Sequence, residues 1–281
     1  MSATVEELGP NDAEALRALL TRDTPHNLYL LGIFEEFGIV PRPGRLPFTF
    51  FGRFNEQREL TAAAFVGGDG GMVVPASNGN GELTALAEGM VGKVHLRACM
   101  GEPGAVETLV RYLGVGRPKV ALSQRVFHVS ADDLGPFTNP TLRPAVEADF
   151  TRLLPLAACC VKETLGRDPL VEDFEAYKAR VMQRIRGRRT YVLELDGRLI
   201  FKIDIGSRSR YGAELEALYT LPDERQRGHA TLSLGQIARH LLSSLPTLTL
   251  RVDENNPSLQ GVARKVGFIA GRTQKLAVME Q

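Results

Sequence analysis

Hydrophobic and polar residues alternate along this chain with two periods, which predicts both strands and helices. In the first half, apolar runs at residues 48–54, 60–66 and 71–75 are separated by turn residues, as in an antiparallel meander. Apolar residues spaced three and four apart predict helices on either side of the meander. The expected helices cover residues 11–20, 25–37, 81–90 and 105–113, and further strands are expected at 94–99 and 123–129.

The second half repeats this order of elements. A strand at residues 142–145 leads into a leucine-rich helix, and a second helix is expected at 171–185. The pair Asp196-Gly197 is a strong two-residue turn signal that predicts a hairpin. The elements expected after these two helices are the hairpin strands at 190–195 and 199–205, a strand at 213–221, a helix at 228–245, a strand at 247–252 and a short helix after Pro257.

An internal duplication explains this repeated order. Residues 5–20 and 142–154 each read as a strand, an acidic cap and the leucine-rich start of a helix. Acidic residues, glycine and two prolines interrupt all periodic patterns at residues 132–140. We therefore expect two domains of similar fold, at 1–138 and 139–281. Each is an α/β (α+β) structure with a mixed, mostly antiparallel sheet flanked by helices.

Composition narrows the class of protein. The 281 residues carry a net charge of +1, which gives no reason to expect a nucleic acid as partner. No run approaches the roughly 18 consecutive apolar residues of a membrane span, and the first residues do not have the pattern of a signal peptide. Three cysteines and five dispersed histidines make neither a disulfide framework nor a metal-ligand spacing. We expect a cytoplasmic protein that binds no metal, no membrane and no nucleic acid.

The strongest functional signal is the segment 224–230. It follows the expected strand at 213–221 and opens the long helix at 228–245. Small residues at Gly228 and Ala230 let the backbone wrap closely around an anion, and the unpaired amides of the first helical turn point at it. An Arg-x-x-Gly-x-Ala string also occurs at ordinary charged helix starts. The strand before it and the helix after it are what indicate a phosphate-binding turn.

With this segment, residues 141–270 resemble the GCN5-related N-acetyltransferase (GNAT) superfamily. Arg225, Gly228 and Ala230 match the superfamily's pyrophosphate-binding signature. Three further matches occur in the superfamily's order: Leu142-Arg143-Pro144-Ala145 with Asp149, the hairpin around Asp196-Gly197, and Asn256 followed by Gly267-Phe268. The whole chain looks like bacterial two-part proteins in which a degenerate GNAT-like half precedes a complete one.

The resemblance implies the GNAT fold and acetyl-CoA as cosubstrate. It implies that the coenzyme binds on the turn and the strand before it, through Leu218, Tyr219, Thr220, Arg225, Gln226, Arg227, Gly228, His229, Ala230, Thr231 and Asn256. Backbone amides at Leu218 and Tyr219 would polarise the acetyl carbonyl.

The first half has no such turn. Its segment Gly101-Glu102-Pro103-Gly104 places a carboxylate, and a proline without an amide donor, where a phosphate would bind. We expect this segment to cap a helix. The first half should serve as a scaffold or as a wall of the acceptor pocket.

Acetyl transfer to an amine needs a group that removes a proton from the amine. Glu214 and Glu216 are two residues apart on the expected strand, so they share one face. Some GNAT members use a glutamate on this strand. The same carboxylates can instead face solvent or pair with arginines such as Arg208 and Arg210.

The chain differs from the superfamily's pattern at the position of the proton donor to the thiolate leaving group. Many members use a tyrosine seven residues after the asparagine, and this chain has Ala263 at that position. Tyr219 or Tyr211 can substitute. A thiolate, with a reference pKa of about 8.5, can also leave without strict protonation. We take Glu214, Glu216 and Tyr219 as the candidate catalytic residues.

The sequence thus predicts an acetyl-CoA-dependent N-acetyltransferase that moves an acetyl group directly to the amine of a small molecule or peptide. We expect a monomer or a homodimer. The alternative is a non-catalytic acyl-CoA-binding or regulatory protein. Ala263 favours this alternative, and the presence of Glu214 and Glu216 favours the enzyme. Small amines, antibiotics, peptide N-termini and lysines all stay open as acceptors, because acceptors are selected by loops, which vary most.

Overall fold

The computed structural model describes residues 4–43, 47–68 and 70–280. Packing divides the chain into two compact units, Met1–Val126 with Gly271–Gln281, and Phe127–Ala270. These units differ from the predicted domains 1–138 and 139–281, because the last strand packs with the first unit and the segment 127–138 packs with the second. Within the described residues, no helix combines the length and the apolar character needed to cross a membrane.

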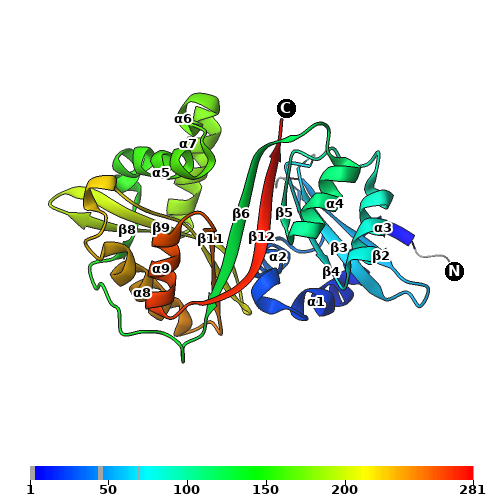
Figure 1. The fold of residues 1–281 in the computed structure, drawn as a ribbon, viewed down its shortest axis with the longest axis horizontal. Helices are drawn as coiled ribbons and strands as arrows, with labels where there is room; N and C mark the ends of the chain where they lie inside the picture. Colours follow the sequence, from blue (N-terminus) through cyan, green and yellow to red (C-terminus); the bar gives the residue numbers. More distant parts are fainter. Residues whose placement is uncertain (1–3, 44–46, 69, 281) are drawn as a thin grey trace. The chain divides into compact units, whose positions relative to one another are not determined.

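The first unit is a sheet with helices on both faces (Figure 1). In chain order its elements are β1 (Thr4–Glu7), the 3-10 turn η1 (Pro10–Asp12), α1 (Ala13–Thr21), α2 (Thr24–Phe37), β2 (Phe48–Phe54), β3 (Leu60–Gly67), β4 (Met72–Ser77), α3 (Asn80–Met90), β5 (Ala98–Gly101), α4 (Pro103–Leu113), most of β6 (Pro118–Val129) and, from the end of the chain, β12 (Ile269–Met279). The strand order is β1-β2-β3-β4-β5-β12-β6.

Alternation along β2 explains how this sheet acquires two apolar faces. Phe51 packs in a cluster with the buried leucines of α3 and α4. Its neighbour Phe50 points to the other face, where its ring makes an edge-on contact with Phe34 of α2, with centroids 6.5 Å apart. The predicted meander is confirmed, since β2, β3 and β4 pair antiparallel in sequence order.

The second unit is built on the same plan. Its elements are β7 (Arg143–Pro144), η2 (Glu147–Asp149), α5 (Phe150–Leu165), α6 (Pro169–Glu172), α7 (Phe174–Arg186), β8 (Thr190–Leu195), β9 (Arg198–Ser209), β10 (Gly212–Thr220), η3 (Pro222–Glu224), α8 (His229–Leu242), β11 (Leu248–Asp253) and α9 (Pro257–Val266). The strand order is β11-β10-β9-β8-β7, with the last residues of β6 beside β11. Helices α8 and α9 pack on one apolar face, and α5 and α7 pack on the other.

Both units begin with the same capping device. In the first unit the Gly9 amide donates to Asp12 Oδ2 at 2.8 Å, and in the second the Val146 amide donates to Asp149 Oδ2 at 2.9 Å. Asp149 also binds Arg143 at 2.6 Å. Through this bond the pKa of the Asp149 carboxyl is lowered to about 2, even though burial of the group opposes the shift. The acidic caps expected near residues 12 and 149 are thus both present.

Three expected elements differ in the structure. The helix expected at 171–185 is broken at Asp173, whose φ of −157° separates α6 from α7. The strand expected at 94–99 begins only at Ala98. Strand β12 is absent from the sequence prediction, although it pairs antiparallel with β5 from Lys275↔Gly101 to Val278↔Ala98 and lies beside β6 in Figure 1.

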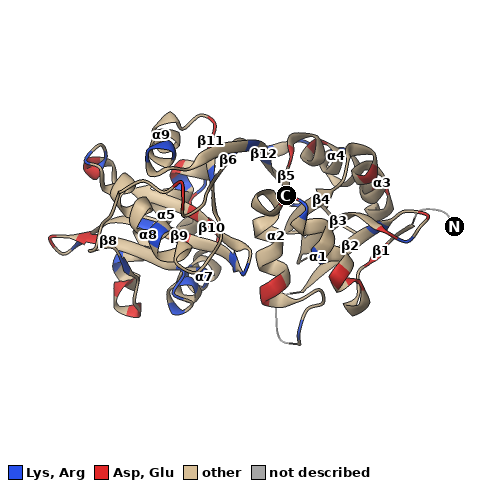
Figure 2. Ribbon diagram, turned by 90° about the horizontal axis from the view of Figure 1, so that it is seen from below, with Lys and Arg blue, Asp and Glu red and all other residues tan. Residues whose placement is uncertain are grey.

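The predicted hairpin is confirmed, with Asp196 at φ +49° and Gly197 at φ +78° between β8 and β9. Both residues adopt the left-handed conformation that the two-residue turn requires. Figure 2 shows basic and acidic residues interspersed along the elements of both units, in keeping with the net charge of +1.

Candidate functional site

The site begins where β10 stops following β11. These strands pair in parallel only from Ala213↔Leu248 to Leu215↔Leu250, whereas β10 stays paired with β9 as far as Thr220. The register of β10 against β9 shifts between Glu216 and Tyr219, and Ala217 in this bulge has φ +49°. A bulge bends its strand. Among the residues that the structure describes, the end of β10 therefore has no strand partner on the β11 side.

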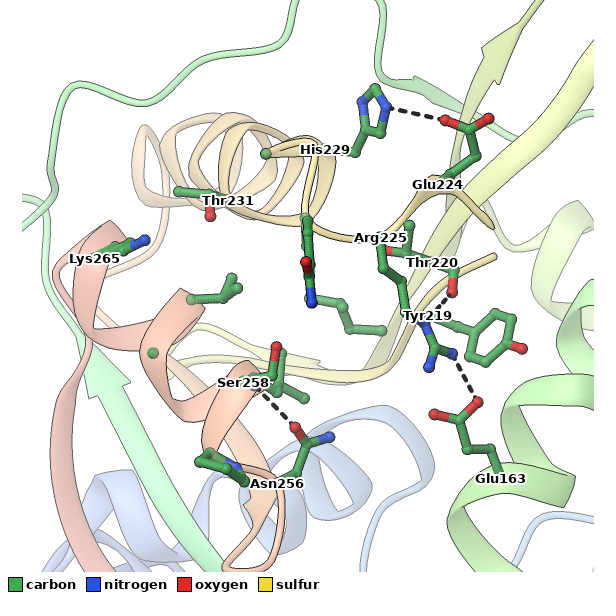
Figure 3. Close-up of a pocket in the computed structure, with 18 residues that line it drawn as sticks. Glu163, Tyr219, Thr220, Glu224, Arg225, His229, Thr231, Asn256, Ser258 and Lys265 are labelled. Atoms are coloured by element: carbon green, nitrogen blue, oxygen red, sulfur yellow. Dashed lines mark hydrogen bonds and ion pairs between the residues drawn. The ribbon is translucent and has the colours of Figure 1, made fainter. Parts of the chain in front are cut away.

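A pocket of about 610 Å³ opens at this end of β10 (Figure 3). This volume is in the range of small-molecule sites. Its walls come from α5, the end of β10, the segment before α8, the first turn of α8, and α9. The lining residues are Glu163, Leu218, Tyr219, Thr220, Glu224, Arg225, Gln226, Gly228, His229, Ala230, Thr231, Asn256, Pro257, Ser258, Leu259, Gly261, Val262 and Lys265.

The turn before α8 is shaped by left-handed backbone. Gln226 has φ +63° and Gly228, the N-cap residue of α8, has φ +85°. Gly228 supplies no side chain to cap the helix, and a Cβ at this position would meet no atom within 4 Å. The first amides of α8 therefore lie at an open position beside the pocket. Amides in this arrangement, at the positive end of a helix dipole, form a binding place for an anion.

Arg225 braces the turn against the sheet and α5. Its Nε donates to the Thr220 carbonyl oxygen at 3.0 Å, and its Nη2 donates to Glu163 at 2.7 Å. The guanidinium carbon lies 5.3 Å from the centroid of the Tyr219 ring. The hydrogen bond that Arg225 donates to Glu163 raises the pKa of Arg225, so the cation is firmly retained.

Two predicted residues near the turn have other neighbours. Arg227 does not line the pocket, and its Nη1 lies 3.0 Å from a carboxylate oxygen of Glu224. The His229 ring is directed away from the cavity toward Glu224, with Nε2 3.5 Å from the carboxylate (Figure 3). His229 thus lines the pocket at the first position of α8 while its ring contacts Glu224.

Helix α9 forms the opposite wall. Asn256 caps it, because its Oδ1 accepts from the Leu259 amide at 2.9 Å. Ser258, Gly261, Val262 and Lys265 follow at helical spacing along the face toward the pocket. Sequence reasoning missed this face. The same three- and four-residue spacing, counted onward from Asn256, is the signal that could have found it.

Ala263 lies on another face of α9. It is fully buried in the apolar cluster beneath α8 and α9 and does not line the pocket. The position at which the resemblance implied a tyrosine is here part of the core.

The two candidate carboxylates lie on the sheet face covered by α5 and α7, and neither lines the pocket. Glu214 is 4% exposed and forms an ion pair with Arg251 of β11. Glu216 is less buried, and its Oε1 lies 2.6 Å from Arg184 of α7. Arg184 also binds Asp204 at 3.1 Å, which in turn binds the buried Lys202 at 2.7 Å. Glu216 is thus the outer member of a charged network on β9, β10 and α7.

Tyr219 lines the pocket but packs its ring into the cluster under α5 and α7. Burial is the main reason why the pKa of its phenol is raised, so the side chain keeps its proton across the physiological range. Tyr211, the other tyrosine considered, lies between β9 and β10 and does not line the pocket.

The structure therefore gathers most of the predicted binding residues around one pocket. Ten of them line it: Leu218, Tyr219, Thr220, Arg225, Gln226, Gly228, His229, Ala230, Thr231 and Asn256. Arg227, Glu214 and Glu216 do not. Glu163 and Glu224 line the pocket without having been predicted. Within the ranges that the structure describes, no group of three or more His, Cys, Asp or Glu side chains could hold a metal ion.

The corresponding strand-to-helix junction of the first unit is nearly filled. The pocket at the end of β4 measures only about 80 Å³. Arg272 lies at this pocket and pairs with both Asp23 and Glu102. Glu102 is the N-cap residue of α4 and Pro103 is its first residue, so the expectation that residues 101–104 cap a helix is confirmed.

Comparisons with known proteins agree with this geometry. Residues 157–268 match the model of the acetyltransferase (GNAT) family, and no curated protein matches the chain. A GNAT-family acetyltransferase from Colwellia psychrerythraea is 12% identical with a TM-score of 0.58, and the match covers 99% of this chain and 100% of that one.

Two further solved structures match over nearly their full length. A GCN5-related N-acetyltransferase from Sphaerobacter thermophilus is 15% identical with a TM-score of 0.60, covering 98% of this chain and 94% of that one. A tandem GNAT protein from the clavulanic acid biosynthesis pathway is 12% identical with a TM-score of 0.55, covering 99% and 98%. At such identities these likenesses concern the fold.

Proposed function

We propose that this chain, which belongs to the GNAT superfamily through residues 157–268, transfers the acetyl group of acetyl-CoA directly to an amine. The family match supports a general acetyltransferase function. One observation carries the finer proposal: the left-handed turn at Gly228 opens the first amides of α8 onto a pocket at the free end of β10.

The pocket suits a long ligand with a phosphate at one end. The pyrophosphate of acetyl-CoA would bind the amides of His229, Ala230 and Thr231, where the helix dipole favours negative charge. Lys265 on the opposite wall adds a cation. The pantetheine arm would follow Leu218–Thr220, the edge that β11 leaves without a partner. When bound, acetyl-CoA supplies the thioester that reacts with the amine.

Direct transfer forms a C–N bond and breaks the C–S bond, and the amine must lose a proton. Glu216 is the better candidate for the proton acceptor. It lies two residues before the pocket residue Leu218 and is more exposed than Glu214, which is enclosed in its pair with Arg251. Amides at Leu218 and Tyr219 would stabilise the charge that develops on the carbonyl oxygen. Tyr219, protonated at neutral pH, is the candidate donor to the thiolate.

The alternative, a non-catalytic acyl-CoA-binding or regulatory protein, has its own support. Both carboxylates on β10 are engaged by arginines, and the position of the missing tyrosine is filled by the buried Ala263. In this arrangement the pocket is kept while neither carboxylate of β10 is free to accept a proton.

Calorimetric titration with acetyl-CoA, followed by release of free thiol with a panel of small amines and peptides, separates these functions. If the protein is an enzyme, acetyl-CoA binds and free thiol is released only when an amine acceptor is present. Binding without transfer to any amine supports the alternative, and the absence of binding contradicts both.

A further inference from the structure

Glu224 is an unexpected residue in a pocket for a polyphosphate. Glu224 is one of the residues that line the pocket, and a negative charge near a phosphate repels it, but Figure 3 shows the carboxylate turned toward the His229 ring and away from the cavity. The side chain is 12% exposed and lies 3.0 Å from Arg227 and 3.5 Å from His229. These two partners are the residues on either side of Gly228.

We propose that Glu224 is a positioning residue, which holds the turn at Gly228 in the shape that binds the pyrophosphate of acetyl-CoA. This inference rests on the proposed function. By engaging both neighbours of Gly228, a single carboxylate fixes the turn from one side.

The turn needs such a restraint. Gln226 adopts a left-handed φ of +63°, a conformation that is unfavourable for a residue other than glycine. Residues 225–228 lie between η3 and α8, outside regular secondary structure. Arg225 is fixed at one end by Thr220 and Glu163. Glu224 provides the second restraint, at the end that joins α8.

The charge of Glu224 is balanced by its neighbours. Arg227 faces it from the turn, and His229 faces it from α8 and adds charge only when protonated. A carboxylate neutralised in this way can shape the turn with little repulsion of the ligand.

Two explanations of Glu224 predict opposite signs. If the carboxylate acted only by its charge, Glu224→Gln would bind acetyl-CoA more tightly. If it positions the turn, the same variant loses affinity, and we expect a loss of about 10-fold by calorimetry. Glu224→Asp keeps the charge but is shorter by one methylene, so it should also lose affinity, whereas a role of charge alone leaves it like the wild type.

Asp223→Asn is the matched control. Asp223 precedes Glu224, carries the same charge, and pairs with Arg198 at 2.5 Å without lining the pocket. Its removal should change the affinity for acetyl-CoA by less than a factor of two.

Hydrogen exchange of the protein without ligand gives a second measurement. In Glu224→Gln the amides of residues 226–231 should exchange faster than in the wild type, and in Asp223→Asn they should not. Unchanged exchange, or unchanged or tighter binding by both Glu224 variants, overturns the proposal. If the wild type itself binds no acetyl-CoA, the proposed function fails, while the exchange data still test whether Glu224 restrains the turn. Thermal melts identify a variant that is unfolded, in which case the other Glu224 variant decides.

Discussion

The two units contain the same strand-to-helix junction in two forms. In each, a strand of the antiparallel meander runs into a helix that leads to a parallel strand and a further helix: β4-α3-β5-α4 in the first unit and β10-α8-β11-α9 in the second. Residues 221–228 separate β10 from α8, whereas only residues 78–79 separate β4 from α3. A short connection has no room for a turn such as the one at Gly228.

The strands differ as well. β4 pairs with β3 in unbroken register from Met72 to Ser77, whereas β10 carries the bulge at Ala217. Near the first junction, Asp23 and Glu102 are the N-cap residues of α2 and α4, and both carboxylates pair with Arg272. The comparison teaches that the larger pocket accompanies a bulge and a longer connection, and not the sheet topology that both units share.

The largest effect should come from the carboxylates that β10 has and β4 lacks. Glu216→Gln should lower the rate of thiol release by about 10² to 10⁴-fold with little change in acetyl-CoA affinity, the usual range for removal of a general base. Glu214→Gln serves as a contrast. It weakens a buried ion pair and should lower the free energy of unfolding by about 3 kcal/mol in a thermal or urea titration. An unaltered rate in Glu216→Gln would assign the proton transfer to another group.

The next effect concerns the turn itself. Gly228→Val places a β-branched residue at φ +85° and a side chain in the anion position, so acetyl-CoA affinity should fall by about 100-fold in a calorimetric titration. Gly197→Val introduces comparable strain at φ +78° in the β8–β9 turn, and it should lower stability while leaving affinity unchanged. Wild-type affinity in Gly228→Val would show that this turn is not the binding place, and two acetyl-CoA molecules bound per wild-type chain would reveal a site in the first unit and break the comparison.

The smallest effect concerns the paired caps. The pKa of Asp149 is lowered from 3.8 to about 2, which corresponds to about 2 kcal/mol of stability at neutral pH. Asp149→Asn should lose this amount in a urea titration, and Asp12→Asn, which weakens one backbone hydrogen bond, should lose about 1 kcal/mol.

The Asp149 contribution also has a defined pH range. Because the folded pKa lies below the unfolded one, the contribution is complete above about pH 4 and is lost as the pH falls toward 2. The difference in the free energy of unfolding between the wild type and Asp149→Asn should therefore disappear over that pH range. A difference that does not change with pH would mean that Asp149 stabilises the protein through packing and not through its charge.

Local signals were enough to predict much of the fold and of the turn. Asp196-Gly197 marks its hairpin because the required backbone conformation favours these residue types. Gly228 marks the turn for a similar reason. The bulge at Ala217 has no such mark, because alanine does not favour a positive φ and the bulge arises from pairing with β9.

Strand β12 escaped prediction for a different reason. Its partner β5 is more than 160 residues earlier in the chain, and its charged residues Arg272 and Lys275 pair with Glu102, the N-cap residue of α4, and with Glu107 in α4. Nothing within residues 269–279 indicates these contacts. Glu163 was missed in the same way, since tertiary packing makes it part of the pocket. Glu224 lies in the segment 224–230 that the sequence singles out, but it was not among the predicted binding residues.

The position of β12 affects the order in which the protein can fold during synthesis. The ribosome makes β5 long before the strand that pairs with it, and all of residues 127–270 must emerge in between. The second unit can fold while the first still has an open sheet edge. Such an edge is a place where chains aggregate, so the nascent protein passes through an exposed state that closes only with its last strand.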